Sequence, residues 1–494
     1  MKRIDFINNT IIFIVFYIFF LVLCGCSSPT SPKTTLTGQI TIEGLTDYSN
    51  ITVSVYDLVK LDSTLVRINT ERPSIGVIIS QQTEFDFREQ EAKSTTNTDA
   101  EGKFSISDLS EGNYNIVVKK NGYGFKIFYN YEVSNGSNNL NTATANNLIT
   151  LYPEVSRSGF IIDNLTLQSD HHYIFTGNTN LSSDVVIEPG AYIRLAGNTS
   201  LHFSGHLSVQ GELGNFVHFT SNDGFFNTTS SVQPYNQITI DNTATLENDL
   251  LEGCLFSYGQ YGLQSFSNCS LKNTVFKTIF SSFQASQINN TSIENCLFQN
   301  SQTSVDIHYI PTVSIMKNIF YKNRIGMYMS SIGTQTMDDG GIIKNNYFQN
   351  NSNIALQISY NSYPLVMYNT ITNNIAGNSY GIQIHQDCSF HISYNRIFAN
   401  ICVYMDGAYV YSPLQNNNLI CPQTGFCLQY ISLHNPDLEA MNNYWGVNNI
   451  ILVPDKIYDK QDMQIENVPF WEIASFVLYD PAKYFPINSA GVQP

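Results

Sequence analysis

Large apolar side chains recur at intervals of 20 to 28 residues through the second half of the chain, commonly with an asparagine two places earlier. The stretch "NIF" at 318–320 shows the pattern. A period in the low twenties predicts a solenoid, in which each repeat forms one coil stacked on the next. The recurring positions are Phe256, Phe276, Phe298, Phe320, Phe348, Ile371, Ile397, Ile420 and Trp445.

A second strand is predicted to begin about seven residues after each of these positions. Apolar residues there alternate with polar ones, which is the pattern of a half-buried strand. The inward column is Leu263, Phe283, Val305, Met327, Leu356, Ile382, Val403 and Leu428, and the residues two places further on are also mostly apolar. The position before this column always holds a small residue, so we expect a tight turn there.

These columns favour a parallel β-helix, whose coils stack at about 4.8 Å so that equivalent side chains lie above one another. The leucine pattern and helical segment of leucine-rich repeats, which have the same period, are missing. The recurring asparagines share the parity of the core and are predicted to stack inside a turn, where their amides bond backbone groups that no strand reaches. They are Asn318, Asn346, Asn369, Asn395, Asn418 and Asn443.

Two flanking segments strengthen the prediction. Residues 184–221 carry "DVVIEPGAYIRLAG", and "MNNYWG" at 441–446 precedes "DKIYDKQD" at 455–462. Both resemble the opening and closing segments of the right-handed β-helix, pectin-lyase-like families, over about 160–470. The resemblance implies a right-handed parallel β-helix over 155–494 with a C-terminal closing segment. It says little about activity, because this fold serves lyases, hydrolases, esterases, adhesins and binding proteins.

Residues 35–154 are predicted to form a small β-sandwich, with strands alternating over 35–132. "NTDAEGKFSISDLSEGNYNIVV" reads as a hairpin, with a turn at Asp99–Gly102 and a second turn at Gly112. The segment resembles the carboxypeptidase regulatory-like, transthyretin-type sandwich. That resemblance implies a spacer or adhesive module. The fold class expected for the whole chain is therefore all-β, with a β-helix solenoid preceded by a sandwich.

The first residues read as an export signal. Lys2 and Arg3 precede an apolar run at 10–23 that is short for a membrane span. "LCGC" then resembles a bacterial lipobox, which implies a signal peptide over 1–26, lipidation of Cys26 and a lipid bilayer as partner. A signal-anchor helix that happens to end in cysteine is the alternative. Residues 27–34 would be a Ser/Pro/Thr tether, and we expect a lipid-anchored protein of the bacterial envelope, at the outer membrane or cell surface rather than the cytoplasmic membrane.

The net charge and the spacing of the cysteines argue against some classes of function. Lys and Arg number 24 against 40 Asp and Glu, and no basic cluster occurs, so we expect no nucleic-acid partner. Seven cysteines follow the leader, an odd number without CxxC or metal spacing, and they are expected to act as buried small hydrophobes.

The outward face of the second strand is the best candidate site. Tyrosine and amide side chains suit neutral saccharides, because a ring stacks on a sugar face while amides bond hydroxyls. The candidate ligand-binding residues are Asp306, His308, Tyr328, Gln357, Gln383 and Tyr404. His385 and Asp406 occupy one column on adjacent coils and are the candidate catalytic pair. A polar face without ligand is the third interpretation.

Metal chemistry has weak support in the sequence, and no cofactor is expected. Asp338 and Asp339, in an extra loop at 331–341, offer a calcium site, although two adjacent acids are far from a full oxygen shell. A copper site could use His385 with Met327, Met329 and Met405, but parity puts those methionines in the core. We expect no metal site at either place.

The preferred hypothesis is a lipoprotein whose β-helix presents a binding surface for carbohydrate or a cell-surface partner. A polysaccharide lyase or glycoside hydrolase centred on His385 and Asp406 is the alternative. The paired carboxylates of hydrolases and the basic column of lyases are missing, so an enzyme is less favoured. A structural envelope protein without ligand is the second alternative.

Overall fold

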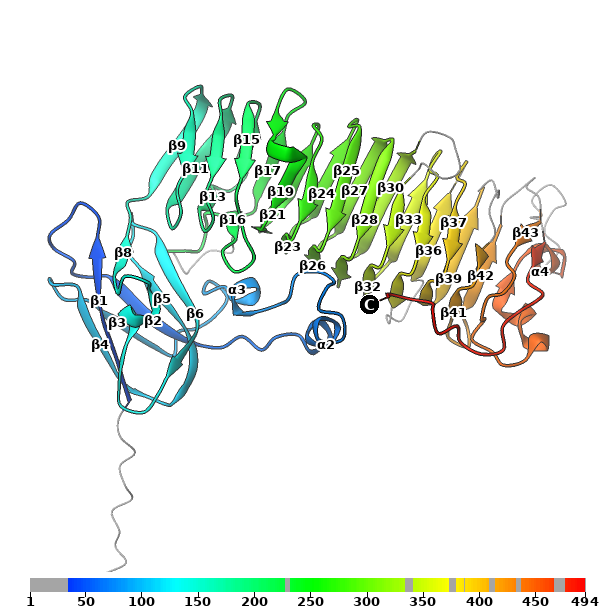
Figure 1. The fold of residues 1–494 in the computed structure, drawn as a ribbon, viewed down its shortest axis with the longest axis horizontal. Helices are drawn as coiled ribbons and strands as arrows, with labels where there is room; N and C mark the ends of the chain where they lie inside the picture. The colour runs from blue at the N-terminus through cyan, green and yellow to red at the C-terminus, as the bar shows by residue number, and fades with distance from the viewer. Residues whose placement is uncertain are drawn as a thin grey trace, which may run out of the picture. The chain divides into compact units, whose positions relative to one another are not determined.

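A computed structural model describes residues 34–226, 232–333, 341–372, 379–385, 387–407, 414–431, 437–465 and 476–493. Cys26 and the rest of the predicted signal peptide, and Asp338 and Asp339, lie outside these residues. The described chain forms two compact units (Figure 1). The first comprises 34–58, 91–119 and 127–150, and the second comprises 59–90, 120–126 and the residues from 151 onward.

The first unit contains two small, sandwich-like sheets. One has the order β4-β1-β7, with β8 also paired to β1, and the other has the order β3-β2-β5-β6. Their alternating apolar residues, such as Val53 and Ile116, are fully buried. The strands are β1 (Thr34–Ile42), β2 (Thr52–Asp57), β3 (Ser94–Asn97), β4 (Lys103–Leu109), β5 (Gly112–Lys119), β6 (Phe125–Val133), β7 (Ser137–Asn139) and β8 (Ile149–Leu151), with a 3-10 turn η1 (Leu140–Ala143).

The predicted hairpin of β4 and β5 is wrong. β4 pairs with β1 and β5 pairs with β2, so the two strands belong to different sheets. The backbone bends at Asp108, which has a φ of 64°, and again at Gly112, with a φ of 150°. These bends redirect the chain from one sheet to the other, where a two-residue hairpin turn would have kept it in one.

The second unit is a β-helix of about 11 coils built from three parallel sheets (Figure 1). We name them the short-strand sheet, the long-strand sheet and the third sheet. Strands β9 (Val155–Ile161) and β11 (His172–Leu181) open the stack and are shared by the first two sheets.

The short-strand sheet continues through β13 (Tyr192–Leu195), β16 (Val217–Ser221), β20 (Cys254–Ser257), β23 (Val275–Lys277), β26 (Leu297–Gln299), β29 (Ile319–Tyr321), β32 (Tyr347–Gln349), β35 (Thr370–Thr372), β38 (Arg396–Phe398) and β41 (Asn418–Ile420). The long-strand sheet continues through β14 (Ser200–Phe203), β17 (Tyr235–Ile240), β21 (Gly259–Ser265), β24 (Ser281–Ser286), β27 (Thr303–Ile310), β30 (Ile325–Ile332), β33 (Ile354–Ser359), β36 (Tyr380–His385), β39 (Ile401–Asp406), β42 (Phe426–Tyr430) and β44 (Ile457–Tyr458).

The third sheet lies in two parts. The first part is β10 (Leu165–Leu167), β12 (Val185–Ile187), β15 (His206–Val209) and β18 (Thr245–Leu246), followed by a 3-10 turn η2 (Glu247–Asp249). The second part is β19 (Leu250–Glu252), β22 (Ser270–Lys272), β25 (Asn290–Glu294), β28 (Thr312–Met316), β31 (Ile342–Lys344), β34 (Leu365–Met367), β37 (His391–Ser393) and β40 (Leu414–Gln415).

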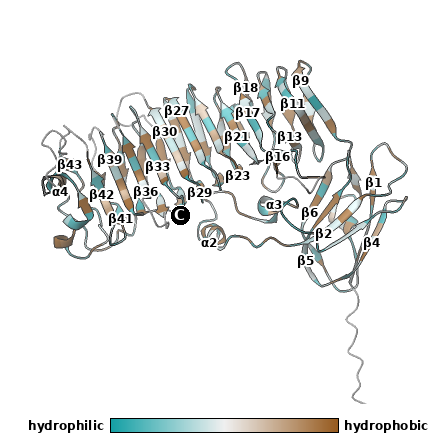
Figure 2. Ribbon diagram, turned by 180° about the vertical axis from the view of Figure 1, so that it is seen from behind, coloured by the Kyte–Doolittle hydropathy of each residue, from teal (hydrophilic) through white to brown (hydrophobic). Residues whose placement is uncertain are grey.

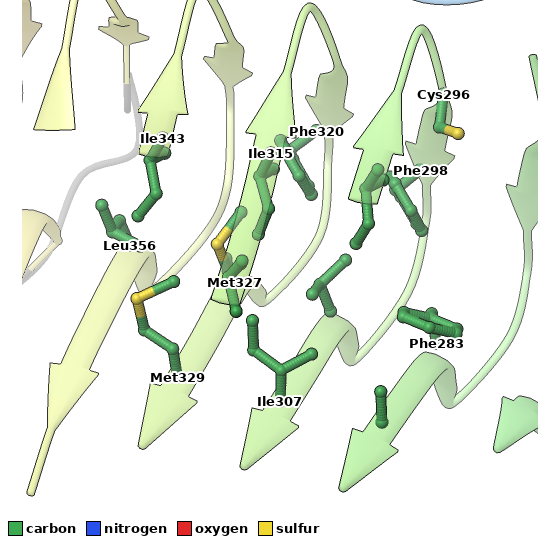
Figure 3. Close-up of a cluster of buried hydrophobic side chains, with 14 of the residues drawn as sticks. Phe283, Cys296, Phe298, Ile307, Ile315, Phe320, Met327, Met329, Ile343 and Leu356 are labelled. Atoms are coloured by element: carbon green, nitrogen blue, oxygen red, sulfur yellow. The ribbon is translucent and has the colours of Figure 1, made fainter. Parts of the chain in front are cut away.

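The register confirms the predicted inward columns from Leu263 to Leu428, because each member pairs with its equivalent on the next coil. Phenylalanines of the short-strand sheet stack almost parallel, with ring centroids 4.5–5.1 Å apart from Phe219 to Phe348. Figure 3 shows Phe298 and Phe320 repeating along the axis, with Met327 and Met329 inside the core. Figure 2 shows hydrophobic and hydrophilic residues mixed along the strands, as this alternation requires.

The asparagine ladder forms as predicted, with one correction. Asn369 Nδ2 donates to Asn395 Oδ1 at 3.0 Å and to the carbonyl oxygen of Ile343 at 2.8 Å, and the other members repeat these bonds. The member on the next coil is Asn417, which is fully buried, and the predicted Asn418 begins β41 instead. Likewise Leu419, not Ile420, pairs with Ile397 in the core.

Residues 59–90 leave the strand pattern expected over 35–132 and cover the outward face of the short-strand sheet. The segment contains α2 (Ser63–Glu71) and α3 (Gln81–Glu84). Leu65 and Ile68 of α2 pack in one buried cluster with outward residues of β20, β23, β26 and β29. Because these short strands expose apolar residues on both sides, a second layer is needed to cover them.

The segment that was predicted to close the far end of the β-helix packs against its last coils. Trp445 is fully buried, and Ile457 of β44 pairs with Leu428 of β42. The remaining elements are the pair β43 (Leu438–Glu439) and β45 (Val477–Leu478), the turns η3 (Ile450–Leu452) and η4 (Pro454–Lys456), and α4 (Lys460–Ile465). Among the described residues, no helix is long and apolar enough to span a membrane.

Candidate functional site

The outward side chains of the long-strand sheet, from β21 to β42, form a polar surface that we call the long-strand face. Successive strands pair in register, so each outward residue lies beside its equivalents on neighbouring coils. One column is Gln264, Gln284, Asp306, Tyr328, Gln357, Gln383, Tyr404 and Gln429. The second is Phe266, Ser286, His308, Ser330, Ser359, His385 and Asp406. The residues predicted for catalysis and for ligand binding therefore all lie on this one face.

A chain of polar contacts crosses the early coils of the face. Gln264 donates to Gln284, whose Nε2 donates to Asp306 Oδ2 at 3.1 Å. Asp306 Oδ1 lies 2.7 Å from His308 Nε2, two places along the same strand. These residues and Phe266 line a hollow of about 120 Å³. The pair was not predicted as a unit, although residues i and i+2 on one strand always share a face.

His385 and Asp406 lie side by side on β36 and β39, with Nδ1 and Oδ2 4.0 Å apart. That separation is too long for a direct hydrogen bond. Partial burial lowers the pKa of His385 below its ordinary value, and the nearby Asp406 carboxylate opposes the shift. Neutral imidazole is therefore the form that this site presents at pH 7.

Tyr328 and Tyr404 are half-buried within the face. The Tyr328 ring lies 5.3 Å from that of His308, and burial raises the pKa of its phenol. The Tyr404 ring lies 5.9 Å from that of His385 and 5.4 Å from that of Tyr380, and burial raises its pKa to about 12. Both phenols are protonated at neutral pH and can donate hydrogen bonds outward.

Tyr309 and Tyr360 were missed by sequence reasoning. They stand one place beyond the second outward column and are 61% and 53% exposed. Both have a positive φ, 55° and 44°, because the chain turns through a left-handed residue here, as it also does at Gln287 and Ser331 on neighbouring coils. A bulky residue there is unfavourable compared with Asn or Gly. The dipeptides "HY" and "SY" at the strand ends were the available signal.

Whether the described part of the chain can bind a metal ion depends on how its ligating side chains are grouped. No group of three or more His, Cys, Asp and Glu side chains there is arranged to hold a metal ion. Met327, Met329 and Met405 point into the core, as their parity predicted. The calcium prediction at Asp338 and Asp339 concerns residues outside the described ranges.

The seven cysteines of the described residues are free thiols, and six of them are buried. Cys421 is only partly buried, and its sulfur lies 3.1 Å from that of Cys427. A hydrogen bond from Cys427 lowers the pKa of Cys421, whereas burial raises the pKa of Cys427. Cys421 is thus the more nucleophilic thiol of the two.

Comparisons with known proteins support the architecture. The family model described as "Right handed beta helix region" matches residues 253–429, which hold most of the long-strand face. This part of the chain is a right-handed β-helix. No curated protein and no solved structure matches the chain. The β-helix is consistent with a binding or an enzymatic surface, so the function has to be argued from the face itself.

Proposed function

We propose that the long-strand face binds a neutral carbohydrate. The observation that carries the proposal is the pair of exposed rings, Tyr309 and Tyr360, beside columns of amide, hydroxyl and imidazole groups. An exposed aromatic ring stacks on the C–H face of a sugar, while amides and hydroxyls bond its hydroxyl groups in both directions. Their strained backbone positions support a role outside folding.

The coil spacing suits an extended polymer. Tyr309 and Tyr360 lie two coils apart, hence roughly 10 Å along the axis. One coil is close to the length of one sugar residue in an extended chain. Gln357, on the coil of Tyr360, and Gln383, on the next coil, continue the amide column, so a glycan lying along the axis would meet equivalent groups repeatedly.

The cellular setting is part of the proposal. Lipidation of Cys26 after removal of residues 1–26, with 27–34 as tether, would anchor the protein in a bacterial envelope. The sandwich-like unit would act as a spacer of the carboxypeptidase regulatory-like kind. Such an arrangement holds a glycan-binding face away from the membrane. Mass spectrometry of the membrane fraction tests it: we expect acylated Cys26 as the first residue.

Binding is tested with the purified full chain on a panel of neutral polysaccharides. Losing two stacking rings should weaken binding about tenfold or more in the Tyr309→Ala/Tyr360→Ala variant. Tyr484→Ala is the matched control, because Tyr484 is also about half exposed but lies far from this face in the sequence. Equal dissociation constants for the double variant and the wild type would exclude the rings as the binding surface.

Polysaccharide cleavage is the second candidate function, and the short Asp306–His308 contact favours it. A carboxylate 2.7 Å from an imidazole beside a hollow can orient a general acid or base. The same incubations are scored for new reducing or unsaturated ends. Product formation lost in His308→Ala or His385→Ala identifies an enzyme, whereas binding without product identifies a capture protein. If neither binding nor product is detected, the result favours a structural envelope protein.

A further inference from the structure

A groove of about 790 Å³ lies on the outer side of the short-strand sheet, apart from the long-strand face. Its floor is the outward residues of β32, β35 and β38. The last turn of α2 lines one part and the C-terminal residues 490–493 line another. Figure 1 shows the C-terminal segment running back along the β-helix to end near β32. The volume is that of a small-ligand site.

The charge of this groove is opposite to that of the chain. Among the described residues it is lined by Arg67, Arg72 and Arg396, against one acid, Glu71. Glu71 is bonded to Arg67 at 3.0 Å. Neither Arg72 nor Arg396 has a carboxylate within ion-pair distance among the residues that the structure describes. In a protein with a net charge of −16, two guanidinium groups at one hollow, neither paired with a carboxylate of the described residues, are a concentrated anion-binding feature.

The remaining lining shows what else the ligand would carry. Thr372 and Gln349 offer a hydroxyl and an amide, and Asn488 adds a second amide. The Phe398 ring is 37% exposed beside Arg396 on the same strand. Guanidinium groups bind carboxylate or phosphate through paired hydrogen bonds, and amides with an aromatic ring suit a hydroxylated ring.

We propose that this groove binds a small polyhydroxylated ligand that carries one carboxylate or phosphate group. Arg72 and Arg396 hold the anionic group, and the ring of the ligand lies against Phe398. This site is a second one, separate from the neutral-glycan site, because it lies on another sheet and recognises a charged group. Its ligand is a small acidic sugar in free form or at the end of a longer glycan.

The walls of the groove are already fixed. Asp62, the N-cap of α2, accepts hydrogen bonds from Tyr321 Oη at 2.7 Å and from Lys322 Nζ at 3.0 Å. The C-terminal segment is fastened by Val492 N, which donates to Thr370 Oγ1 at 3.1 Å. Gly491 has a φ of 98°, and a Cβ there would lie 3.0 Å from Thr370 Oγ1 and 3.2 Å from Arg396 Cβ. Glycine therefore lets the segment pass close to Arg396, and binding needs little reorganisation.

The test measures binding of four probes to the full chain by ligand-observed NMR: glucuronate, glucose 6-phosphate, glucose and inorganic phosphate. We expect the two acidic sugars to bind at least tenfold more tightly than glucose, and more weakly at high salt. Arg72→Gln and Arg396→Gln should each weaken that binding about tenfold or more, because each removes a charge-assisted contact. The stronger of the two acidic sugars identifies the anionic group.

The control is Arg324→Gln, which removes an exposed arginine outside the groove. Unchanged binding in Arg324→Gln, and in Tyr309→Ala/Tyr360→Ala, assigns the acidic sugar to this groove rather than to the long-strand face. Equal binding of glucose and the acidic sugars, or unchanged binding in the Arg72→Gln/Arg396→Gln variant, would overturn the proposal. Because the readouts use different variants, this proposal and that for the neutral glycan can fail separately.

Discussion

At the scale of single residues, the buried asparagines hold each coil to the next. Asn369 is fully buried and uses both ends of its amide: Oδ1 accepts from the backbone and side chain of Asn346, and Nδ2 donates to three oxygens. A side chain that makes five hydrogen bonds cannot be replaced without leaving several buried polar groups unpaired. Removing one member of the ladder therefore leaves buried polar groups without hydrogen-bond partners on both neighbouring coils.

Asn369→Ala is expected to lower the free energy of unfolding of the β-helix by about 3 kcal/mol, because buried donors and acceptors lose their partners. Urea denaturation followed by circular dichroism measures the change. Asn290→Ala is the control, since Asn290 is exposed on β25. A change in Asn369→Ala no larger than that in the control would contradict the ladder's role.

The pair Cys421 and Cys427 is expected to form a disulfide under mild oxidation. With 2,2′-dithiodipyridine, the Cys421 thiolate attacks the reagent, Cys427 then displaces the bound thiopyridine, and two thiopyridones leave. The measurement is peptide mapping, which should show both cysteines in one linked peptide with two hydrogens lost. Cys427→Ser should leave a stable mixed disulfide on Cys421. A linked product in that variant would contradict the assignment.

At the scale of the elements, the segment 59–90 depends on a buried ion pair. Arg88 and Asp86 are joined at 2.7 Å, and Arg88 also donates to the carbonyl oxygen of Ser221 at 3.0 Å. Burial opposes ionisation of Asp86, but Arg88 holds the pKa of that carboxyl below its ordinary value. A charge pair of this kind is needed as a pair, because either partner alone is a buried, uncompensated charge.

Asp86→Ala is expected to weaken docking of this segment by about 3–5 kcal/mol, since Arg88 loses its carboxylate. The expected result is faster limited proteolysis between residues 59 and 90, with the β-helix left intact. Glu71→Ala removes an exposed acid of the same segment and should leave the cleavage rate unchanged. Equal protection of Asp86→Ala and wild type would show that the apolar contacts of Leu65 and Ile68 suffice.

How much of this architecture the sequence could predict depends on how local the signal is. The inward columns were predicted because strict apolar–polar alternation identifies the strands, and a repeat of 20 to 28 residues identifies the coils of a solenoid. The slip from Asn417 to Asn418 arose where three asparagines follow one another at 416–418, and Asn416 takes a φ of 58°. Periodicity alone cannot locate such a turn.

Other features depend on contacts distant in sequence. The segment 59–90 is a second layer whose partners are distant in sequence, as in the hydrogen bond from Tyr321 to Asp62, 259 residues apart, so no local pattern predicts it. The candidate face was predicted residue by residue, but the exposure of Tyr309 and Tyr360 depends on the left-handed turn that the chain makes at these two residues. The groove lined by Arg72 and Arg396 combines the end of α2, strands from successive coils and the C-terminal residues, and only the folded chain brings them together.

At the scale of the whole second unit, buried histidines make stability depend on pH. His172 and His218 are buried and stack on either side of Tyr192, with centroids 4.7 Å and 4.2 Å away. Burial lowers the pKa of His172 well below its ordinary value and that of His218 to about 3. The unfolded chain, with ordinary histidine pKa values, therefore binds more protons below pH 6.5 than the folded chain does.

Stability should consequently fall as the pH drops from about 6.5, by about 1.4 kcal/mol per pH unit for each histidine. The measurement is denaturation at pH 7, 6 and 5, a range above the titration of most carboxylates. His218→Phe keeps an aromatic ring beside Tyr192 and should reduce the slope. A slope unchanged in this variant would mean that His218 does not contribute.

The docking of 59–90 also has a consequence for the order of events during synthesis. Gly76 N donates to the carbonyl oxygen of Lys317, and Lys277 Nζ donates to that of Thr83, so the partners of this segment are made much later than the segment itself. During that interval, the apolar side of α2 has nothing to cover it. The nascent chain thus exposes apolar surface that can aggregate while the first coils are assembled. A holding chaperone that acts before the coil containing Lys317 is complete would be most useful to this protein at that stage.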